Sequence, residues 1–369
     1  ATAKDLYRRL QPLRIAGRPY TTPLPAAEAR GLLYVRPELV AEVEFATWTA
    51  DRRVRHAAWR GLREDKPAGA ILRDEEGTAV LPRARSSRPR LTHPERVYWP
   101  DADITKKDLA DYHAAVWPRM VRFVAGRPLA LKRCPEGIDH PCFFQKHPWK
   151  GMSPAIRVTP DPADPGQQLL GVDDLDGVLG LVQGGALELH PWGARLDDLE
   201  RPDFLTFDLD PGEDTGWPQV VEAAHEVRQR VETAGLAAFV KTSGGKGLHV
   251  VVPIVPKARW PVAKAWAKRL ATAIAQDRPD RYVATMSKAR RRGRIFIDWL
   301  RNARGTTAVA PWSPRARPGA PVSMPIAWDE LDQGIGPASF TLEDSVRRTT
   351  DPWAGFSDAA RPLPSGRKS

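Results

Sequence analysis

The chain has 369 residues, of which 42% are hydrophobic and 27% are charged. At roughly 150 residues per domain, this length predicts about two or three domains, and the apolar content excludes a chain that is disordered throughout. The longest apolar run, at 248–255, is much shorter than the roughly 20 residues that a membrane-spanning helix needs. We therefore expect a soluble, cytoplasmic protein with no membrane partner.

The charge balance is basic, with 56 Lys and Arg against 45 Asp and Glu, a net charge of +11. This balance is typical of proteins that bind nucleic acid, although a solvated basic surface gives the same count. Residues 288–317 are more telling, because they hold nine basic residues and a single acid, Asp298. An acid alone in a basic segment is a candidate for a specific role.

The two cysteines, Cys134 and Cys142, are too few for a disulfide framework, which fits a reducing compartment. With His140 and His147 they match no standard zinc-site spacing, so a zinc site is disfavoured. The chain begins at Ala1 and not at methionine, which suggests a fragment or a processed product.

Residues 31–66 predict a small sheet. Val43 and Phe45 alternate with polar neighbours, and a second run at 54–62 follows a short polar turn. The periodicity then fades into a stretch at 67–90 that is rich in Pro, Gly, Ser and Arg, as is typical of a basic linker. A domain boundary is expected there.

The second domain begins near residue 91 and alternates helices with short strands. Thr105 followed by Asp108 is typical of a capped helix start, and an apolar stripe follows it. Apolar stripes and β-branched runs predict the later elements. These are strands at 204–210, 238–242, 248–255 and 294–300, a helix at 217–233, and a helix at 260–275 with Val262, Trp266, Leu270 and Ile274 on one face.

Three aspartates on these strands are candidate metal ligands. Asp208 and Asp210 are two residues apart in one strand, so their side chains leave the same face, and Asp298 lies in the middle of another strand. Like charges 4 Å apart repel by roughly 4 kcal/mol at an effective dielectric constant of 20, and a cation relieves this repulsion. Three such carboxylates suit two Mg²⁺ or Mn²⁺ ions. An Asp-x-Asp pair alone also fits a turn or a surface edge, and the trio also suits a nuclease.

The segment Ser243–Gly247 is glycine-rich and joins two predicted strands. Its glycines let backbone N–H groups approach a phosphate, and Lys246 supplies a positive charge. The spacing of a P-loop is absent, and a plain turn is the alternative. His249, two residues further on, is either part of the same site or a structural histidine.

Three motifs occur in a familiar order: Phe-Asp-Leu-Asp-Pro at 207–211, Lys-Thr-Ser-Gly-Gly-Lys-Gly-Leu-His at 241–249 and Ile-Asp-Trp at 297–299. With them the chain resembles the polymerase domain of bacterial ligase D, the multifunctional end-joining DNA ligase, in the archaeo-eukaryotic primase superfamily. The resemblance implies an α+β fold, with a primase-like core of mixed or antiparallel sheets flanked by helices. It runs from about 91 to 356 and includes the segments 91–100, 143–147 and 315–322.

The resemblance implies which residues hold the metals and the incoming nucleotide. The catalytic ligands of two Mn²⁺ or Mg²⁺ ions would be Asp208, Asp210 and Asp298. The residues around the sugar and triphosphate of an NTP or dNTP would be Ser243, Lys246, His249 and Arg315, and His190 would contact the same nucleotide.

The resemblance also implies a DNA-binding set. Arg96 and Lys106 fall where the family grips the 5′-phosphate of a gapped or broken DNA end; the family more often has lysine at the first position, and both cations bind phosphate. Aromatic residues of the family stack on template bases where this chain has Phe143 and Phe144; the alternative, a buried Phe pair in a core strand, stays open for one of the two. Two further basic residues are Lys132 and Arg133, which either line the DNA-binding groove or form a solvated basic edge.

The N-terminal residues carry a resemblance of their own. The segments 34–45 and 59–66 are similar to the end of the ATP-dependent ligase module of the same enzymes, whose oligonucleotide-binding (OB) barrel closes with Arg-x-Asp-Lys, here 63–66. The nucleotide-accepting Lys-x-Asp-Gly motif is absent from the chain, so ligase activity is not expected. The expected domains are an OB-fold remnant at 1–66, a linker at 67–90, a primase-polymerase domain at 91–358 and a flexible tail at 359–369.

The function implied is template-directed nucleotidyl transfer in non-homologous end joining. The enzyme would prefer ribonucleotides and fill gaps at the bacterial nucleoid, with the Ku end-binding protein and the ligase and nuclease modules of the same system as partners. Three alternatives remain open at this point: a primase that starts strands without a primer, a metal-dependent nuclease, and a DNA-end binding module without catalysis.

Overall fold

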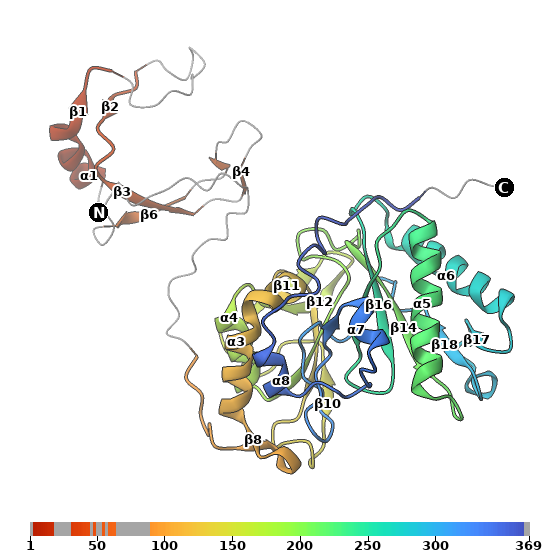
Figure 1. Cartoon of the computed structure of the whole chain (residues 1–369). Coiled ribbons are helices and arrows are strands. Elements are labelled where there is room, and N and C mark those ends of the chain that lie inside the picture. Colours follow the sequence, from red (N-terminus) through yellow and green to blue (C-terminus); the bar gives the residue numbers. More distant parts are fainter. Residues whose placement is uncertain are drawn as a thin grey trace. The chain divides into compact units, whose positions relative to one another are not determined.

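The computed structural model describes residues 3–17, 31–44, 47–48, 54–55, 58–63 and 89–364. The chain divides into two compact units, Ala1–Leu81 and Pro82–Ser369 (Figure 1). Most of the expected linker, from 67 to 88, lies outside the described residues. Among the described helices, none combines the length and the apolar character required to cross a membrane.

The first unit contains short strands that pair in antiparallel twos. β3 pairs with β6, as expected of the two predicted runs, and the β4–β5 pair lies between them in sequence. Among the described residues these pairs are separate two-stranded sheets and not the single small sheet that was predicted; Phe45 itself lies outside the described residues. The elements are α1 (Ala3–Leu10), η1 (Gln11–Leu13), β1 (Arg14–Ile15), β2 (Tyr34–Val35), β3 (Val40–Glu44), β4 (Thr47–Trp48), β5 (Val54–Arg55) and β6 (Ala58–Arg63).

The second unit begins with a hairpin, a long helix and a five-stranded sheet. Thr105 caps α3 with the predicted capping box, in which its side chain accepts from Asp108 N and the Asp108 carboxylate accepts from Thr105 N. In the sheet β10, β9, β12 and β11 follow one another, and β13 also pairs with β9. The elements are β7 (Val97–Trp99), η3 (Pro100–Ala102), β8 (Ile104–Thr105), α3 (Lys106–Val124), β9 (Leu129–Arg133), β10 (Phe143–Gln145), β11 (Arg157–Asp161), β12 (Asp164–Gly171), α4 (Leu175–Gln183) and β13 (Ala186–Pro191).

A six-stranded sheet follows, in the order β17-β18-β14-β16-β15-β19, in which only β17 and β18 are parallel. Together the two sheets and their helices form the predicted α+β fold. The elements are β14 (Phe204–Pro211), α5 (Trp217–Thr233), β15 (Phe239–Thr242), β16 (Leu248–Pro253), α6 (Trp260–Asp277), β17 (Tyr282–Val283), η4 (Lys288–Arg290), β18 (Ile295–Asp298), β19 (Pro325–Ile326), α7 (Trp328–Asp332) and α8 (Leu342–Arg347).

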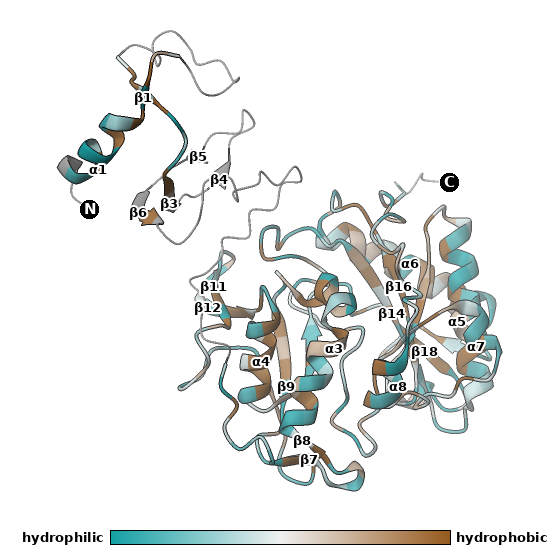
Figure 2. Cartoon of the chain, turned by 60° about the vertical axis from the view of Figure 1, so that its left-hand side comes forward, coloured by the Kyte–Doolittle hydropathy of each residue, from teal (hydrophilic) through white to brown (hydrophobic). Residues whose placement is uncertain are grey.

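Strand β14 separates an apolar face from a polar one, as its alternation predicts. Leu205, Phe207 and Leu209 are fully buried, and the Phe207 ring lies 6.4 Å from the Trp266 ring of α6. Figure 2 shows this layering as hydrophobic strands beneath helices with hydrophilic faces. One expectation for α6 is wrong: Val262 is exposed, and Ala263 and Ala267 are buried in its place, because the buried stripe runs along a neighbouring row of the helix.

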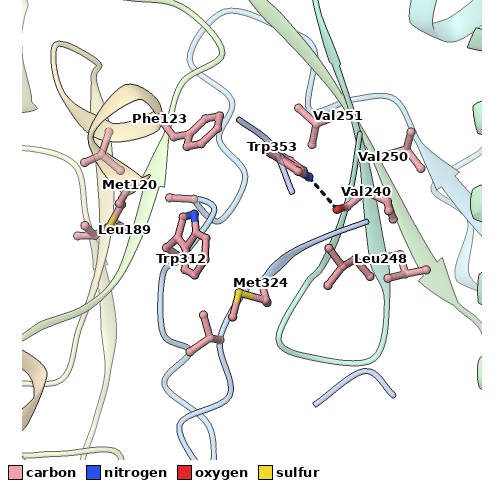
Figure 3. Close-up of a cluster of buried hydrophobic side chains, with 14 of the residues drawn as sticks. Met120, Phe123, Leu189, Val240, Leu248, Val250, Val251, Trp312, Met324 and Trp353 are labelled. Atoms are coloured by element: carbon pink, nitrogen blue, oxygen red, sulfur yellow. Dashed lines mark hydrogen bonds between the residues drawn. The ribbon is translucent and has the colours of Figure 1, made fainter. Parts of the chain in front are cut away.

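A buried aromatic and aliphatic cluster joins the two sheets (Figure 3). Met120 and Phe123 of α3 contribute to it from one side, and Val240 of β15 contributes from the other. Trp353 donates a hydrogen bond from its indole N–H to Val240 O at 3.0 Å, so the cluster satisfies a polar group that it buries. This core holds the two sheets at a fixed separation and so positions the cavity described below.

Two sequence expectations are revised by the structure. Cys134 and Cys142 form a disulfide that closes the loop between β9 and β10. Their sulfurs are therefore not available to a zinc ion, and the cysteine count alone did not indicate this bond. In the expected tail, Arg361 pairs with the segment directly after β16, where Val255 N donates to Arg361 O at 3.1 Å; residues beyond 364 are outside the described part of the chain.

His113 on α3 makes stability depend on pH. Its side chain is 0% exposed, and neither ring nitrogen has a hydrogen-bond partner among the described residues. Burial lowers the pKa of His113 from 6.5 to about 4. In the unfolded chain His113 binds a proton at a higher pH than in the folded chain. The contribution of neutral His113 to the stability of the fold is therefore complete above about pH 6.5 and is lost as the pH falls toward 4.

The free energy of unfolding of the parent protein falls between pH 7 and pH 4, and we expect this fall to be smaller by roughly 3 kcal/mol in His113→Leu, at 1.36 kcal/mol per pKa unit. Urea unfolding followed at several pH values measures this difference. His140→Leu is the control, because His140 is exposed. A pH profile that is the same for His113→Leu and the parent protein would contradict the assignment.

Candidate active site

The six-stranded sheet places four charged or titratable side chains in one row. Asp208 on β14 lies directly opposite Asp298 on β18 and His249 on β16, and His249 lies opposite Lys241 on β15. Residues directly opposite one another on antiparallel strands share a face of the sheet. The row therefore crosses four adjacent strands on the face away from Phe207, and Figure 1 shows β14, β16 and β18 side by side.

The three predicted carboxylates meet on this face. Asp208, Asp210 and Asp298 each offer an oxygen, and the three oxygens all lie within 4.8 Å of one another. Asp208 and Asp298 are buried, whereas Asp210 is half-buried at the end of β14. The structure thus brings together the three residues that sequence reasoning singled out as a group.

Two arginines that were given no role at these carboxylates also contact them. Arg301 lies 3.4 Å from Asp208 Oδ2 through Nη2 and 3.1 Å from Asp298 Oδ2 through Nε. Arg291 Nη1 lies 3.8 Å from Asp210 Oδ2. From the sequence, both arginines were only members of a basic run. The one signal that could have linked Arg301 to the carboxylates is its position three residues after Asp298.

The carboxylates differ in their affinity for protons. Burial raises the pKa of Asp298, and burial together with the charges of Asp208 and Asp298 raises the pKa of Asp210 to about 6. For Asp208 burial also acts upward, but the charge and hydrogen bond of His249, at 3.2 Å, and the charge of Arg301 outweigh it and hold the pKa below the usual value. The three carboxylates repel one another, and this repulsion contributes to the raised pKa of Asp210; a bound cation would relieve it.

The glycine-rich tip is a tight turn that packs against β14. Ser243 N donates to Gly247 O at 3.0 Å, and Gly247 N donates to Ser243 Oγ at 3.2 Å. A side chain at Gly247 would meet Leu209 O at 2.2 Å, and Gly244 has φ +61°, so both positions require glycine. The turn leaves Lys246 exposed beside the carboxylates.

The cavity over this row measures about 610 Å³, which lies within the roughly 300 to 1,000 Å³ that is usual for small-molecule and cofactor sites. It is lined from both sheets and from the segments between them. Of the predicted residues, Phe144, His190, Asp208, Asp210, Ser243, Lys246, His249 and Arg315 line it, together with Arg301 and Arg317.

Arg96 and Lys106 lie side by side at the β7–β8 hairpin. Lys106 N donates to Arg96 O at 2.8 Å, and the Lys106 ammonium donates to Thr92 O at 2.9 Å. Burial and the charge of Arg96 lower the pKa of Lys106 to about 8. Two adjacent cations, one buried and one exposed, suit an anion such as a phosphate.

The aromatic pair lies on an edge strand and is accessible. Phe143 is 46% exposed and Phe144 is 60% exposed, so the alternative of a buried core pair is wrong. Arg133 lies over the Phe143 ring at 5.4 Å, and Lys132 Nζ lies 3.7 Å from a buried carboxylate of Glu188. Both basic residues are half-buried and paired, so neither is a fully solvated edge.

Comparison with known proteins shows which family the chain is similar to. The family "LigD, primase-polymerase domain" matches residues 105–353, and "ATP dependent DNA ligase C terminal region" matches residues 1–66. The multifunctional non-homologous end joining protein LigD of Pseudomonas aeruginosa is 37% identical over 374 residues, which cover 96% of this chain and 44% of that protein. The corresponding Mycobacterium tuberculosis protein is 34% identical over 264 residues, which cover 68% of this chain and 34% of that protein.

A solved structure also matches. The polymerase domain from Mycobacterium tuberculosis ligase D in complex with DNA has a TM-score of 0.68 and 32% identity, and the match covers 74% of this chain and 100% of that one. The chain spans less than half the length of these two curated relatives. Residues 1–66 match the C-terminal region of ATP-dependent DNA ligases, and the family match, the structural match and the predicted motifs agree that the chain belongs to the LigD primase-polymerase family.

Proposed function

We propose that this chain is a template-directed nucleotidyltransferase that extends a primer and fills gaps at DNA breaks, with ribonucleoside triphosphates as preferred substrates. The observation that carries the proposal is the convergence of Asp208, Asp210 and Asp298 within 4.8 Å beside a cavity that Lys246 and Arg315 also line. Carboxylates that gather cations and basic groups that gather phosphates are the two requirements of phosphoryl transfer.

The three aspartates fit divalent cations, because their oxygens are hard ligands and because the charges of Asp208 and Asp298 add to burial in raising the pKa of Asp210. We infer that they hold two Mg²⁺ or Mn²⁺ ions. Such ions, when bound, make the primer 3′-hydroxyl more acidic and offset the charge of the leaving pyrophosphate.

The other cavity residues would bind and orient the nucleotide. Lys246 and Arg315 would neutralise the triphosphate, and Ser243 and His190 would contact the sugar. His249 donates toward Asp208 at 3.2 Å and so orients that carboxylate. Phe143 and Phe144 would stack on template bases, and Lys132 and Arg133 would support the strand that carries these rings.

The biological setting is part of the proposal. The relatives are end joining and DNA repair proteins by name, and the solved polymerase domain is in complex with DNA. We infer that this chain acts on chromosomal breaks at the bacterial nucleoid, with Ku and with the ligase and nuclease modules of the same system. We expect no sealing activity, since the chain lacks the Lys-x-Asp-Gly motif.

Primer extension on a gapped duplex with a 5′-phosphate tests the function, with Mn²⁺ and with either ribonucleotides or deoxyribonucleotides. Stepwise extension directed by the template, faster with ribonucleotides, is the expected result. Degradation of labelled DNA without nucleotides would instead indicate a nuclease. End binding with no extension would indicate a non-catalytic module, and synthesis without a primer would indicate a primase.

Recognition of the 5′-phosphate gives a separate prediction. Lys106→Gln is expected to lower the preference for a 5′-phosphorylated gap over an unphosphorylated one by about tenfold, because a charge-assisted contact is lost. The dependence of log affinity on log salt should also become shallower by about 1. Fluorescence anisotropy over a range of salt concentrations measures both quantities.

Lys107→Gln is the matched control for this variant, since Lys107 is the next residue, is exposed and pairs with Asp111 at 2.6 Å. It should keep the preference for the phosphate. Equal preference in the parent protein and in Lys106→Gln would remove Lys106 from the phosphate site, and a parent protein with no preference for the phosphate would remove both Arg96 and Lys106.

A further inference from the structure

Glu188 on β13 is a buried carboxylate that connects several of the proposed binding residues. It is 1% exposed, and its Oε2 accepts from His190 Nε2 at 2.8 Å and from Arg315 Nε at 3.0 Å. Its Oε1 accepts from Ala316 N at 2.9 Å and lies 3.7 Å from Lys132 Nζ. His190 and Arg315 line the 610 Å³ cavity, whereas Glu188 stands behind them.

The bond to Glu188 decides what the His190 ring presents to the cavity. An ionised carboxylate accepts hydrogen bonds only, so His190 Nε2 must carry the hydrogen. Burial lowers the pKa of His190, which favours the neutral ring with a single N–H. Nδ1 is then an acceptor, and within residues 89–364 no side chain or backbone group donates to it.

Arg315 is oriented in the same way. Its Nε donates to Glu188 at 3.0 Å, and its Nη1 donates to Ser243 O in the glycine-rich turn. These two bonds use two of the five guanidinium N–H groups and leave three for another acceptor. Since Arg315 lines the cavity, the free donors suit the oxygens of a phosphate.

We propose that Glu188 is a positioning residue that sets sugar selectivity, because it makes His190 a hydrogen-bond acceptor for a ribose hydroxyl and aims Arg315 at the phosphates. The inference rests on the proposed nucleotidyl transfer and adds the residue that prepares the pocket for a ribonucleotide. A site that is built to pair with a hydroxyl discriminates against a substrate that lacks it.

The test is Glu188→Gln, which keeps the shape of the side chain but places an amide N–H₂ against groups that donate. With Glu188→Gln we expect the ribonucleotide over deoxyribonucleotide ratio of kcat/KM to fall about tenfold, mostly through a higher KM for the ribonucleotide, as one lost hydrogen bond implies. The matched control is Glu232→Gln, a change on the outer surface of α5, where Glu232 pairs with Arg228. It should leave the ratio unchanged.

A spectroscopic measurement on the parent protein does not depend on the variant folding. Imidazole ¹⁵N NMR, with the His190 signal assigned by His190→Gln, should show the neutral tautomer with hydrogen on Nε2. In Glu188→Gln the signal should move toward the other tautomer or toward exchange between the two. Hydrogen on Nδ1 in the parent protein would overturn the proposal.

The two proposals fail in different ways. Primer extension by the parent protein, with the same sugar ratio in the parent and in a folded Glu188→Gln variant, would overturn the role of Glu188 alone. Absence of extension by the parent protein under any nucleotide and metal would overturn nucleotidyl transfer, while the NMR measurement would still report the tautomer of His190.

Discussion

Replacing Asp208 with asparagine is expected to lower the rate of primer extension by roughly 10³-fold or more while DNA affinity stays within about twofold. Asp208 lies between two other members of the row, opposite Asp298 on one side and His249 on the other. The amide keeps the size of the side chain but removes one negative charge and one ligand oxygen. Primer extension in single turnover and fluorescence anisotropy of gapped DNA measure the two effects.

The control for this variant is Asp277→Asn, which makes the same chemical change at the end of α6, where Asp277 pairs with Arg230 at 2.7 Å. It should extend primers at the rate of the parent protein. Extension by Asp208→Asn at a rate close to that of the control would reject the assignment of the three aspartates as cation ligands. A loss of DNA affinity as large as the loss of rate would instead place Asp208 in DNA binding.

Strand alternation was sufficient to predict the faces of β14. The two-residue spacing of Asp208 and Asp210 and the burial of Leu205, Phe207 and Leu209 follow from the period of a strand, which is a local property. The capping box at Thr105 is local in the same sense, and the structure has it. Helix α5 also has the predicted limits of 217 and 233.

The pairing of strands could not be obtained in this way. Asp298 is 90 residues from Asp208 in the sequence, and the two meet only because β18 lies beside β14 in the register Asp208 to Asp298. A shift of one residue would turn Asp298 to the opposite face. Sheet order and register depend on the core that forms between the sheets, so the juxtaposition of the carboxylates was implied by a family resemblance and not by periodicity.

Residues that act behind the site were missed for a related reason. Glu188 is a single acid in a buried strand, and its importance is visible only when His190, Arg315 and Lys132 converge on it from three different segments. Arg301 belonged to a basic run whose charges could pair either with DNA phosphates or with carboxylates of the protein. A sequence states which charges exist, whereas the fold decides which of them are neighbours.

Repulsion among the carboxylates leads to a prediction on stability. Asp210 is 44% exposed and lies within 4.8 Å of two other carboxylates, with Arg291 at 3.8 Å as its nearest cation. After screening by solvent we expect Asp210→Asn to stabilise the metal-free protein by about 1 kcal/mol, a fraction of the roughly 4 kcal/mol of an unscreened pair at 4 Å. Thermal unfolding in EDTA at neutral pH measures this gain.

The same substitution should reverse the response to metal. Mn²⁺ at 100 times its dissociation constant stabilises a folded protein by about 2.7 kcal/mol, so the Tm of the parent protein should rise when EDTA is replaced by Mn²⁺. In Asp210→Asn the lost ligand oxygen should abolish most of that rise. The control is Asp214→Asn, which removes an exposed charge four residues away that pairs with Arg292. If Asp210→Asn kept the full rise in Tm and gained no stability in EDTA, the carboxylates would not be the site at which Mn²⁺ binds, and the negative charge that they share would have to be balanced by Arg291 and Arg301 alone.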